Sequence, residues 1–384
     1  MAVGPFSLTV EGWRDINHSY ALVNQQQLLE LAAYPDIALY HVDRPLPYAN
    51  WNATRNDSGL SQEARARLRG IPPPPKQGTD VVYRIDWPYR RHGADAERLF
   101  VFLTSENHRF DTQDFCDEPQ PGRRYRAEPA YVTPSAWSRE GLLACGFPDA
   151  AVVPHGVDPQ LFRPATGEER ARRRAALGIP ADSFVFLNVS AMTYNKGVDL
   201  VIVAFCRLWQ RHRGIRLVLK DQSNLFAQTA AGLIGELAPQ LPQLMTPEAL
   251  AAIKVVSSNL GLEELRLLYA SADAYVSPYR AEGFNLPPLE AAACGLPVIL
   301  TRGGATDDYF DRSFALGVES ARITSDQLGV YLEPRLDDLV DKMESLLEGR
   351  AGVPAGAAGR SFVSERFSWR AATRRLVDLL GGGA

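Results

Sequence analysis

Short runs of β-branched and aromatic residues alternate with longer stretches of helical periodicity along most of this chain. This alternation constrains the fold more than any other feature, because it is typical of β-α-β units around a parallel sheet. The expected strands are Phe6–Val10, Ile37–Val42, Val81–Ile85, Leu99–Thr104, Ala130–Val132, Ala151–Val153, Phe184–Val189, Ile215–Leu219, Ile253–Ser257, Ala274–Ser277 and Pro297–Leu300. The expected helices include Ala21–Ala33, Ser138–Ala144, Val198–Arg211, Leu262–Ala270, Leu289–Ala293 and Leu336–Leu347.

A chain of 384 residues is long enough for two or three domains. The expected boundary lies between Phe162 and Ile179, where the sequence is charged and interrupted by Pro and Gly. We therefore predict two doubly wound α/β domains, with ligands bound in the cleft between them, at the carboxyl ends of strands. The arginines of Arg170–Arg174 are interpreted as a solvated helix face, with contact to an anionic membrane as the alternative. A last helix is expected near Trp369–Leu380, with Ser368 as its N-cap.

Composition and charge exclude several functional classes. The 41 basic and 45 acidic side chains give a net charge of −4, so the chain lacks the basic excess that nucleic-acid binding requires. The four cysteines are widely spaced, which argues against a zinc site and a disulfide framework. No signal peptide is evident, and no apolar run approaches the roughly 18 residues of a membrane span. We therefore expect a cytoplasmic protein, and a peripheral membrane contact is left open.

The segment from Glu282 to Glu290, with the sequence EGFNLPPLE, follows an expected strand and opens a helix. Four residues keep a backbone N–H just before that helix: Gly283, Phe284, Asn285 and Leu286. Such amides suit an anion, in particular a diphosphate. Because a diphosphate repels a nearby carboxylate, the two glutamates are expected to accept hydrogen bonds from sugar or ribose hydroxyls. A helix-capping or surface carboxylate is the alternative for either one.

This segment resembles the paired-glutamate signature of the GT-B retaining glycosyltransferases, in particular glycosyltransferase family 4. The stretch Leu262–Ile299 resembles the family's central signature nearly end to end. Val132–Pro164 is similar to the end of the family's N-terminal domain, and Asn195–Phe205 to its phosphate-binding lysine segment. The resemblance covers most of residues 130–310 and covers residues 1–129 only loosely.

The resemblance implies a GT-B fold, in which two Rossmann-like domains face a central cleft and a C-terminal helix crosses back. The expected ranges are residues 1–165 for the acceptor-side domain and 166–362 for the nucleotide-sugar-binding domain. Residues 363–384 are expected to form the helix that packs back toward the N-terminal domain. The implied activity is retaining transfer from a UDP- or GDP-sugar to an acceptor hydroxyl, in glycan, polysaccharide or glycolipid biosynthesis. The acceptor is a glycan or lipid-linked molecule, and no other cofactor is implied.

The family's site residues carry over to matching positions of this sequence. Glu282 would contact the donor sugar near the reacting carbon, and Glu290 would bind the ribose hydroxyls. Lys196 would neutralise the diphosphate, and the Gly283–Leu286 amides would hold phosphate and sugar oxygens. A fixed cation and aimed amides stabilise the charge that develops on the leaving phosphate. No divalent metal is then required, and the sequence has no Asp-x-Asp cluster to bind one.

One position departs from the family pattern. The family usually places a Gly-Arg pair about five residues before the lysine, where this chain has Ser190-Ala191. Lys220 is a candidate replacement, because it ends an expected strand and can point toward the same crevice. A surface lysine at a strand end is the alternative.

The N-terminal half offers weaker candidates. Gly12 follows the first expected strand and precedes a helix, so its loop can approach the donor. The resemblance implies a His or Glu near the donor sugar after the fourth strand, and both Glu106 and His108 are retained because the register is open. Asp86-Trp87-Pro88 is interpreted as acceptor-cleft lining or as a packed tryptophan. His155 is placed near the cleft with a structural role.

For the mechanism we favour front-face attack, in which the leaving phosphate oxygen takes the acceptor proton. A covalent route through Glu282 is less attractive, because this glutamate is needed for sugar hydroxyls. A sugar phosphorylase or sugar-nucleotide hydrolase on the same scaffold is one alternative. A non-catalytic nucleotide-binding or scaffold subunit is another, suggested by the missing arginine. A nicotinamide dehydrogenase lacks support, because no G-x-G-x-x-G follows a strand. The sugar, the base and the acceptor stay undetermined.

Overall fold

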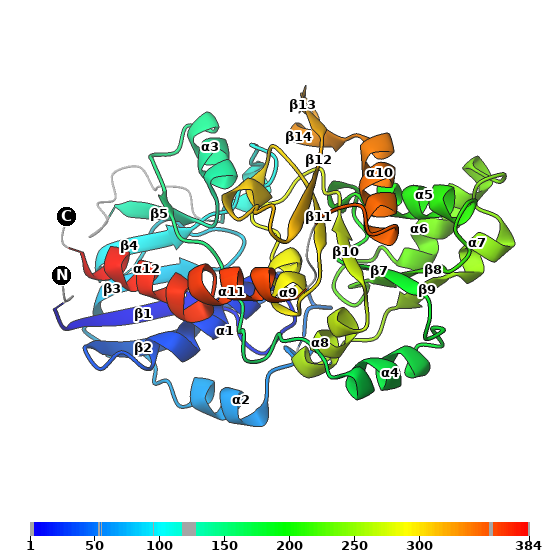
Figure 1. Cartoon of the computed structure of the whole chain (residues 1–384). Coiled ribbons are helices and arrows are strands. Elements are labelled where there is room, and N and C mark those ends of the chain that lie inside the picture. The colour runs from blue at the N-terminus through cyan, green and yellow to red at the C-terminus, as the bar shows by residue number, and fades with distance from the viewer. Residues whose placement is uncertain are drawn as a thin grey trace. The chain divides into compact units, whose positions relative to one another are not determined.

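The computed structural model describes residues 4–52, 54, 56–94, 96–116, 128–352 and 356–382. The chain forms two compact units (Figure 1). The first unit combines Met1–Gly156 with Phe367–Ala384, and the second unit is the continuous stretch Val157–Arg366. The chain therefore leaves the first unit once and returns to it at its end.

The first unit contains a six-stranded parallel sheet in the order β2-β1-β3-β4-β5-β6. Its strands are β1 (Phe6–Gly12), β2 (Ile37–Asp43), β3 (Thr79–Ile85), β4 (Ala96–Phe102), β5 (Pro129–Thr133) and β6 (Ala151–Val152). Its helices are α1 (Ser19–Leu31), α2 (Gln62–Arg69), α3 (Ala136–Ala144) and α12 (Trp369–Gly381), with a 3-10 turn at Thr112–Asp114.

The helix α12 packs against α1 within the first unit. The Ser368 hydroxyl accepts from the Ala371 amide at 3.3 Å, which confirms the predicted N-cap. His155 is buried, with its ring 5.6 Å from that of Phe102 and 6.4 Å from that of Trp369, and this burial lowers its pKa to about 3. The structural role expected for His155 is thereby supported, because the ring is buried against two aromatic side chains.

The second unit contains another six-stranded parallel sheet, in the order β12-β11-β10-β7-β8-β9. Its strands are β7 (Phe184–Val189), β8 (Ile215–Lys220), β9 (Ile253–Val256), β10 (Ala274–Ser277), β11 (Val298–Thr301) and β12 (Ala315–Val318), followed by an antiparallel hairpin of β13 (Ser320–Ser325) and β14 (Gly329–Pro334). Its helices are α4 (Gly167–Ala176), α5 (Val198–Trp209), α6 (Ala230–Leu237), α7 (Pro247–Ala251), α8 (Leu262–Ala270), α9 (Pro287–Ala293), α10 (Leu336–Leu347) and α11 (Ala357–Arg366). Short 3-10 turns lie at Tyr194–Lys196, Ala238–Gln240 and Ala305–Asp308. The main apolar core packs α5 and α10 against this sheet.

The charged stretch in α4 is not the solvated helix face that the sequence suggests. Arg174 is buried, and its Nη2 lies 2.6 Å from Asp273 Oδ2. Arg170 pairs with the other carboxylate oxygen of Asp273 at 2.5 Å. Only part of the run faces solvent, as at Arg172, whose side chain is 70% exposed. The prediction was wrong for Arg170 and Arg174 because their partner, Asp273, lies about a hundred residues further along the chain.

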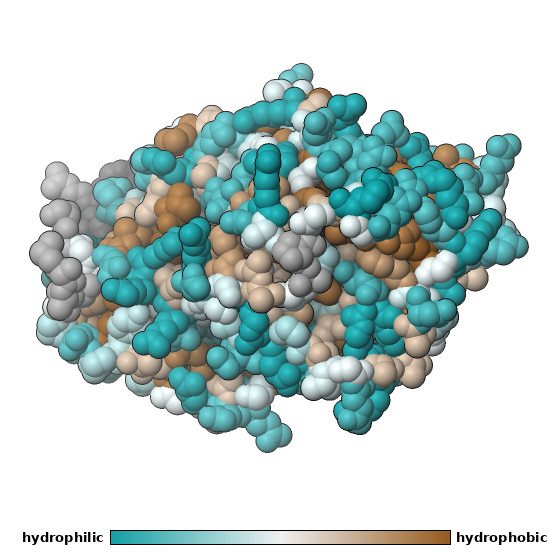
Figure 2. All heavy atoms as spheres, viewed as in Figure 1, coloured by the Kyte–Doolittle hydropathy of each residue, from teal (hydrophilic) through white to brown (hydrophobic). Residues whose placement is uncertain are grey.

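Among the described residues, no helix combines the length and apolar character needed to cross a lipid bilayer. The face drawn in Figure 2 is mainly hydrophilic, with smaller groups of hydrophobic residues between the polar ones.

Candidate active site

The residues of the glutamate signature and the lysine segment follow neighbouring strands of the second sheet. Strand β7 lies between β10 and β8, and all three are parallel. Their carboxyl ends, at Val189, Ser277 and Lys220, therefore meet at one edge of the sheet. Ligands of open α/β sheets bind at this kind of edge.

Lys196 and Glu282 form an ion pair at this edge. The Lys196 Nζ lies 2.9 Å from Glu282 Oε1, and the two side chains are 17% and 12% exposed. A pair with so little exposure is screened less by solvent than a surface pair. The structure therefore brings together two residues that are 86 positions apart and that sequence reasoning assigned to one site.

The backbone around this pair is locked. The Asn195 carbonyl accepts from the amides of Arg280, at 2.7 Å, and Ala281, at 3.1 Å. The Asn195 side chain donates to the Ala281 carbonyl at 3.3 Å. Gly197 has a φ of +67°, and a Cβ there would lie 2.0 Å from the Pro278 carbonyl oxygen. Only glycine fits this position, so the lysine loop and the loop after β10 keep a fixed separation.

Arg280 supports both loops, and sequence reasoning missed it. Its buried guanidinium donates to both oxygens of Asp199, at 2.7 and 2.8 Å, and to the Tyr194 carbonyl at 3.0 Å. It also contacts Glu333 on β14 at 3.2 Å and covers the ring of Tyr194 at 4.0 Å. The signal was present as an arginine two positions before Glu282, but its partners lie on α5 and β14.

Glu290 is a buried acid in the first turn of α9. Its residue is only 5% exposed, and the Tyr269 hydroxyl donates to Oε2 at 2.7 Å. Burial raises the pKa of Glu290 to about 7. A surface carboxylate, one of the alternatives considered for this residue, is therefore excluded. The carboxyl can exist in both protonation states near neutral pH.

The four residues Gly283–Leu286 form the loop before α9, as predicted, and Leu286 is the N-cap position. Asn285 adopts a left-handed conformation with φ of +68°. Its side chain donates to Ser277 Oγ at 3.0 Å, and its carbonyl accepts from the Tyr309 hydroxyl at 2.6 Å. The ring of Phe284 is buried 5.4 Å from the ring of Tyr309. These contacts fix the loop, and the assignment of its amides to phosphate oxygens stays a prediction.

Lys220 occupies the end of β8 next to β7, at the same sheet edge. It is buried, its Nζ donates to the Asp221 carbonyl, and burial lowers its pKa. The alternative of a surface lysine is thereby excluded. Ala191, at the position of the family's arginine, is also buried and offers no charge. Replacement of that arginine by Lys220 stays a prediction.

The candidates of the first unit have strong local contacts of their own. Gly12 ends β1, and a Cβ there would lie 2.7 Å from Cγ of Asn24 on α1. The close approach of this helix is therefore one reason for the glycine. The Trp87 indole donates to Asp114 Oδ1 at 3.0 Å, which supports the packed alternative for that tryptophan.

Glu106 and His108 lie in the loop after β4, packed against α3. The Trp137 indole donates to the Glu106 carbonyl at 2.8 Å. His108 is buried, with φ of +53°, its Nε2 3.1 Å from the Trp137 carbonyl and its ring 4.2 Å from the Trp137 ring. This packing gives His108 a structural role, while the predicted contact of either residue with a donor sugar stays a prediction.

Curated relatives match part of this chain. Residues 169–351 match the family described as Glycosyl transferases group 1. A D-inositol 3-phosphate glycosyltransferase of Saccharomonospora viridis is 32% identical over 241 residues, which are 60% of this chain and 50% of that protein. A GDP-mannose-dependent α-(1-6)-phosphatidylinositol monomannoside mannosyltransferase of Mycolicibacterium smegmatis is 27% identical, over 65% of this chain and 61% of that protein. The chain thus spans half to about three fifths of the length of these relatives.

Solved structures share the fold over nearly the whole chain. Sucrose-phosphate synthase from Thermosynechococcus elongatus has a TM-score of 0.65 at 15% identity, covering 97% of this chain and 98% of that one. Anabaena Alr3699/HepE in complex with UDP and glucose has a TM-score of 0.66 at 14% identity, covering 98% and 100%. The resemblance seen in the sequence is confirmed at this level: the chain has the GT-B fold, and residues 169–351 match the family of glycosyl transferases group 1.

Proposed function

We propose that this chain is a retaining glycosyltransferase that moves a sugar from a UDP- or GDP-sugar to an acceptor hydroxyl. The observation that carries the proposal is the Lys196–Glu282 pair, held at a sheet edge by a locked backbone. In this proposal residues 166–362 bind the donor, residues 1–165 bind the acceptor, and residues 363–384 complete the acceptor domain.

The proposed reaction breaks the bond between the anomeric carbon and the β-phosphate oxygen. The acceptor oxygen forms its new bond on the same face of the sugar, and its proton passes to the departing phosphate oxygen. Lys196 stabilises the negative charge that grows on the phosphate, as a preorganised cation does. Because the Glu282 carboxylate is already paired with Lys196, it suits hydrogen bonding to sugar hydroxyls better than covalent attack.

Glu290 completes the proposed donor site. Its carboxyl would accept hydrogen bonds from the ribose hydroxyls through one oxygen, since the other already accepts from Tyr269. The fixed charge of Lys196 would do the work that a divalent cation does in other sugar-nucleotide enzymes. Magnesium is therefore expected to be dispensable.

The named relatives support the choice of substrates. One uses GDP-mannose and a phosphatidylinositol mannoside, another is named for inositol 3-phosphate, and a structural neighbour binds UDP. We therefore favour a UDP- or GDP-sugar donor and a glycan or lipid-linked acceptor. A lipid-linked acceptor would place the chain at the cytoplasmic face of a membrane as a peripheral protein.

The first experiment is thermal unfolding with UDP, GDP or ADP, each with and without magnesium. A ligand at about 100 times its Kd stabilises the native state by roughly 2.7 kcal/mol, which moves the midpoint by degrees. We expect one diphosphate to raise the midpoint, and magnesium to make no difference. If none of the three raises it, the donor site does not bind these nucleotides and the non-catalytic scaffold alternative replaces this proposal.

A second experiment tests the chemistry with the donor that the first one selects. NMR of the product should show the anomeric configuration of the donor retained. Full-speed donor hydrolysis without an acceptor would instead indicate a hydrolase, and acceleration by inorganic phosphate would indicate a phosphorylase. A glycosyl-Glu282 adduct in mass spectra would overturn the front-face route.

A further inference from the structure

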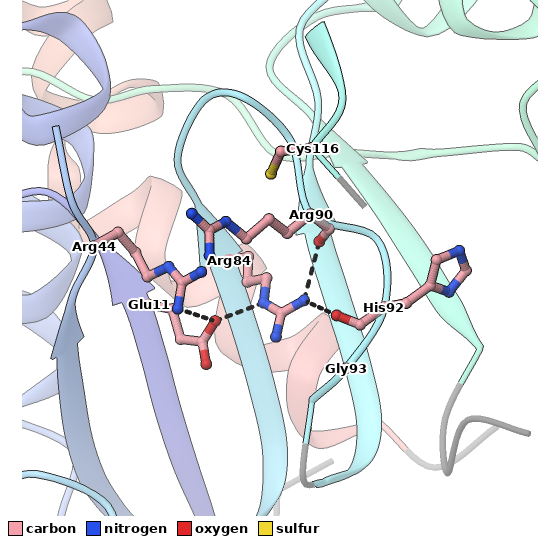
Figure 3. Close-up of a pocket in the computed structure, with 7 residues that line it drawn as sticks. All are labelled: Glu11, Arg44, Arg84, Arg90, His92, Gly93 and Cys116. Atoms are coloured by element: carbon pink, nitrogen blue, oxygen red, sulfur yellow. Dashed lines mark hydrogen bonds and ion pairs between the residues drawn. The ribbon is translucent and has the colours of Figure 1, made fainter. Parts of the chain in front are cut away.

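A pocket of about 440 Å³ opens at the carboxyl edge of the first unit's sheet (Figure 3). Three arginines line it: Arg44 directly after β2, Arg84 on β3 and Arg90 in the loop after β3. Glu11 on β1 and Cys116 also line it, whereas the imidazole of His92 points away from the arginines in Figure 3. All seven residues that line this pocket belong to the first unit, whereas Lys196, Glu282 and Glu290 belong to the second.

Arg84 is part of the framework of the pocket. Its side chain is 4% exposed, and its Nε donates to Glu11 Oε2 at 2.5 Å across the β1–β3 pair. Its Nη1 donates to the carbonyls of Arg90, at 3.1 Å, and His92, at 2.6 Å. These bonds hold the loop after β3 against the sheet and so fix the position of Arg90.

Arg44 and Arg90 differ from Arg84 because, among the described residues, most of their donors have no hydrogen-bond acceptor. Arg44 donates through Nε to Asp86 Oδ2 at 3.3 Å, and its Nη1 lies 3.9 Å from Glu11. Arg90 meets Asp86 only at 3.8 Å and makes no side-chain hydrogen bond within the described part of the chain. Its Nε is buried and has no hydrogen-bond partner there. Since the two side chains are only 16% and 33% exposed, the fold holds two guanidinium groups partly out of water with unused donors.

The charges of the pocket favour an anion. Three arginines face two carboxylates, Glu11 and Asp86, which leaves a positive excess. A guanidinium group binds the oxygens of phosphate or carboxylate in a bidentate manner. A carboxylate has two oxygens and satisfies one such group, whereas a phosphate group can offer oxygens to both. The pocket therefore suits a phosphate better than a carboxylate.

We propose that this pocket binds the phosphate group of a phosphorylated acceptor between Arg44 and Arg90. Phosphate binding by the pocket is inferred from the pocket's own geometry. The assignment of that phosphate to an acceptor rests on the proposed function. The volume of about 440 Å³ leaves room for the sugar or polyol that carries the phosphate. The competing explanation is an ion network that only stabilises the first unit.

The test compares Arg90→Gln with Arg139→Gln. Arg90 makes no side-chain hydrogen bond in the described chain, so its replacement should leave the fold intact. Arg139 is a half-exposed arginine on α3 that pairs with Asp149, and it provides the same change in net charge outside the pocket. Binding of inorganic phosphate and of inositol 3-phosphate is measured by calorimetry on the full chain. Since phosphate can also bind at the predicted diphosphate site, the test depends on the difference in affinity between the two variants.

We expect Arg90→Gln to weaken inositol 3-phosphate binding by about tenfold or more, as the loss of a charged hydrogen-bonding group does. Arg139→Gln should bind like the wild type. Alkylation of Cys116 by iodoacetamide provides a local readout, because Cys116 is exposed and lines the pocket. Inositol 3-phosphate should slow alkylation of Cys116 but not of the exposed Cys145. Equal affinities for wild type and Arg90→Gln, with no protection of Cys116, would overturn the proposal.

A second arm distinguishes a soluble phosphate from a lipid headgroup. Phosphatidylcholine vesicles with or without phosphatidylinositol are sedimented with the wild type and with Arg90→Gln. Arg90-dependent binding to the phosphatidylinositol vesicles, without binding of inositol 3-phosphate, would assign the pocket to a lipid headgroup. If phosphate binds through Arg90 but no nucleotide stabilises the chain, the pocket stands and the glycosyltransferase proposal fails. The two failures are therefore distinguishable.

Discussion

The carboxyl edges of the two sheets are built on opposite principles. In the second unit, Lys196 has a partner at 2.9 Å, and the surrounding backbone is locked by hydrogen bonds and by Gly197. In the first unit, Arg44 and Arg90 line an open pocket, and most of their donors make no hydrogen bond to the described residues. In our proposals, the second edge presents a preset ion pair to the sugar donor, whereas the first edge offers hydrogen-bond donors that a phosphate would satisfy.

The difference shows that a preorganised charged group and an unsatisfied binding group are recognised in a structure by different features. Preorganised charge is recognised by short, reciprocal contacts and a constrained backbone. Binding capacity is recognised by polar groups that the fold partly buries and does not pair. Four substitutions test this comparison.

The largest effect is expected for Arg84→Met, which removes the framework arginine of the first edge. It leaves Glu11 without its closest partner and two carbonyls without a donor, so the free energy of unfolding should fall by about 3–5 kcal/mol. Urea unfolding followed by tryptophan fluorescence reports on the first unit, which contains five of the six tryptophans. Arg90→Gln is the matched control and should change stability by less than about 0.5 kcal/mol. Equal losses for both variants would remove the distinction between framework and ligand arginines.

The next effect concerns the fixed charge of the second edge. Lys196→Ala should lower kcat by about 10²–10³-fold, because a preorganised cation is lost from the leaving phosphate. The control is Lys342→Ala on α10, which breaks a more exposed pair with Asp338. Steady-state kinetics with the donor found by thermal unfolding measure the change. A kcat within about threefold of the wild type would show that the locked pair is only structural.

The third prediction is that Glu290 makes the free energy of unfolding depend on pH. Its folded pKa of about 7 exceeds the ordinary value of 4.5, so between these pH values the unfolded chain loses a proton that the native chain keeps. The free energy of unfolding therefore falls by about 3 kcal/mol as pH rises from 4.5 to 7, and it levels off above. Glu290→Gln lacks this slope, so the stability of the wild type relative to the variant should decline over that range. A stability difference between the wild type and Glu290→Gln that is the same at all pH values would contradict the burial of this carboxyl.

The smallest effect is expected at Lys220, the proposed replacement for the missing arginine. Lys220→Met should lower kcat by at least about tenfold, which corresponds to roughly 1.4 kcal/mol. Stability should not fall, because the substitution removes a charge whose burial disfavours it. Lys254→Met, at an exposed position on β9, is the control. Wild-type turnover in Lys220→Met would leave Lys196 as the only cation proposed for the donor site.

Features that depend on residues close together in the chain could be predicted from the sequence. The strands at Phe184–Val189 and Ala274–Ser277 begin and end where their apolar runs do. Glu282 and Glu290 were found because one short segment carries both. Resemblance then supplied Lys196, and the structure placed its side chain against Glu282.

Features that depend on distant partners could not be predicted in this way. Burial of Arg174 depends on Asp273, and the role of Arg280 depends on Asp199. The arginine pocket is assembled from four separate segments, each of which looks like an ordinary loop or strand end. The hairpin of β13 and β14 was missed because its short strands lie mostly at partly exposed positions and carry no continuous apolar run.

The return of the chain to the first unit has a consequence for biosynthesis. The second unit is one continuous stretch, so it can fold as soon as it has left the ribosome. The first unit cannot be completed then, because α12, which packs on α1, is made near the end. Until α12 arrives, the side of α1 that it covers is open to water and to other nascent chains. A ribosome that stalls in the second unit would thus release a chain with an unfinished first unit, which chaperones and proteases would have to handle.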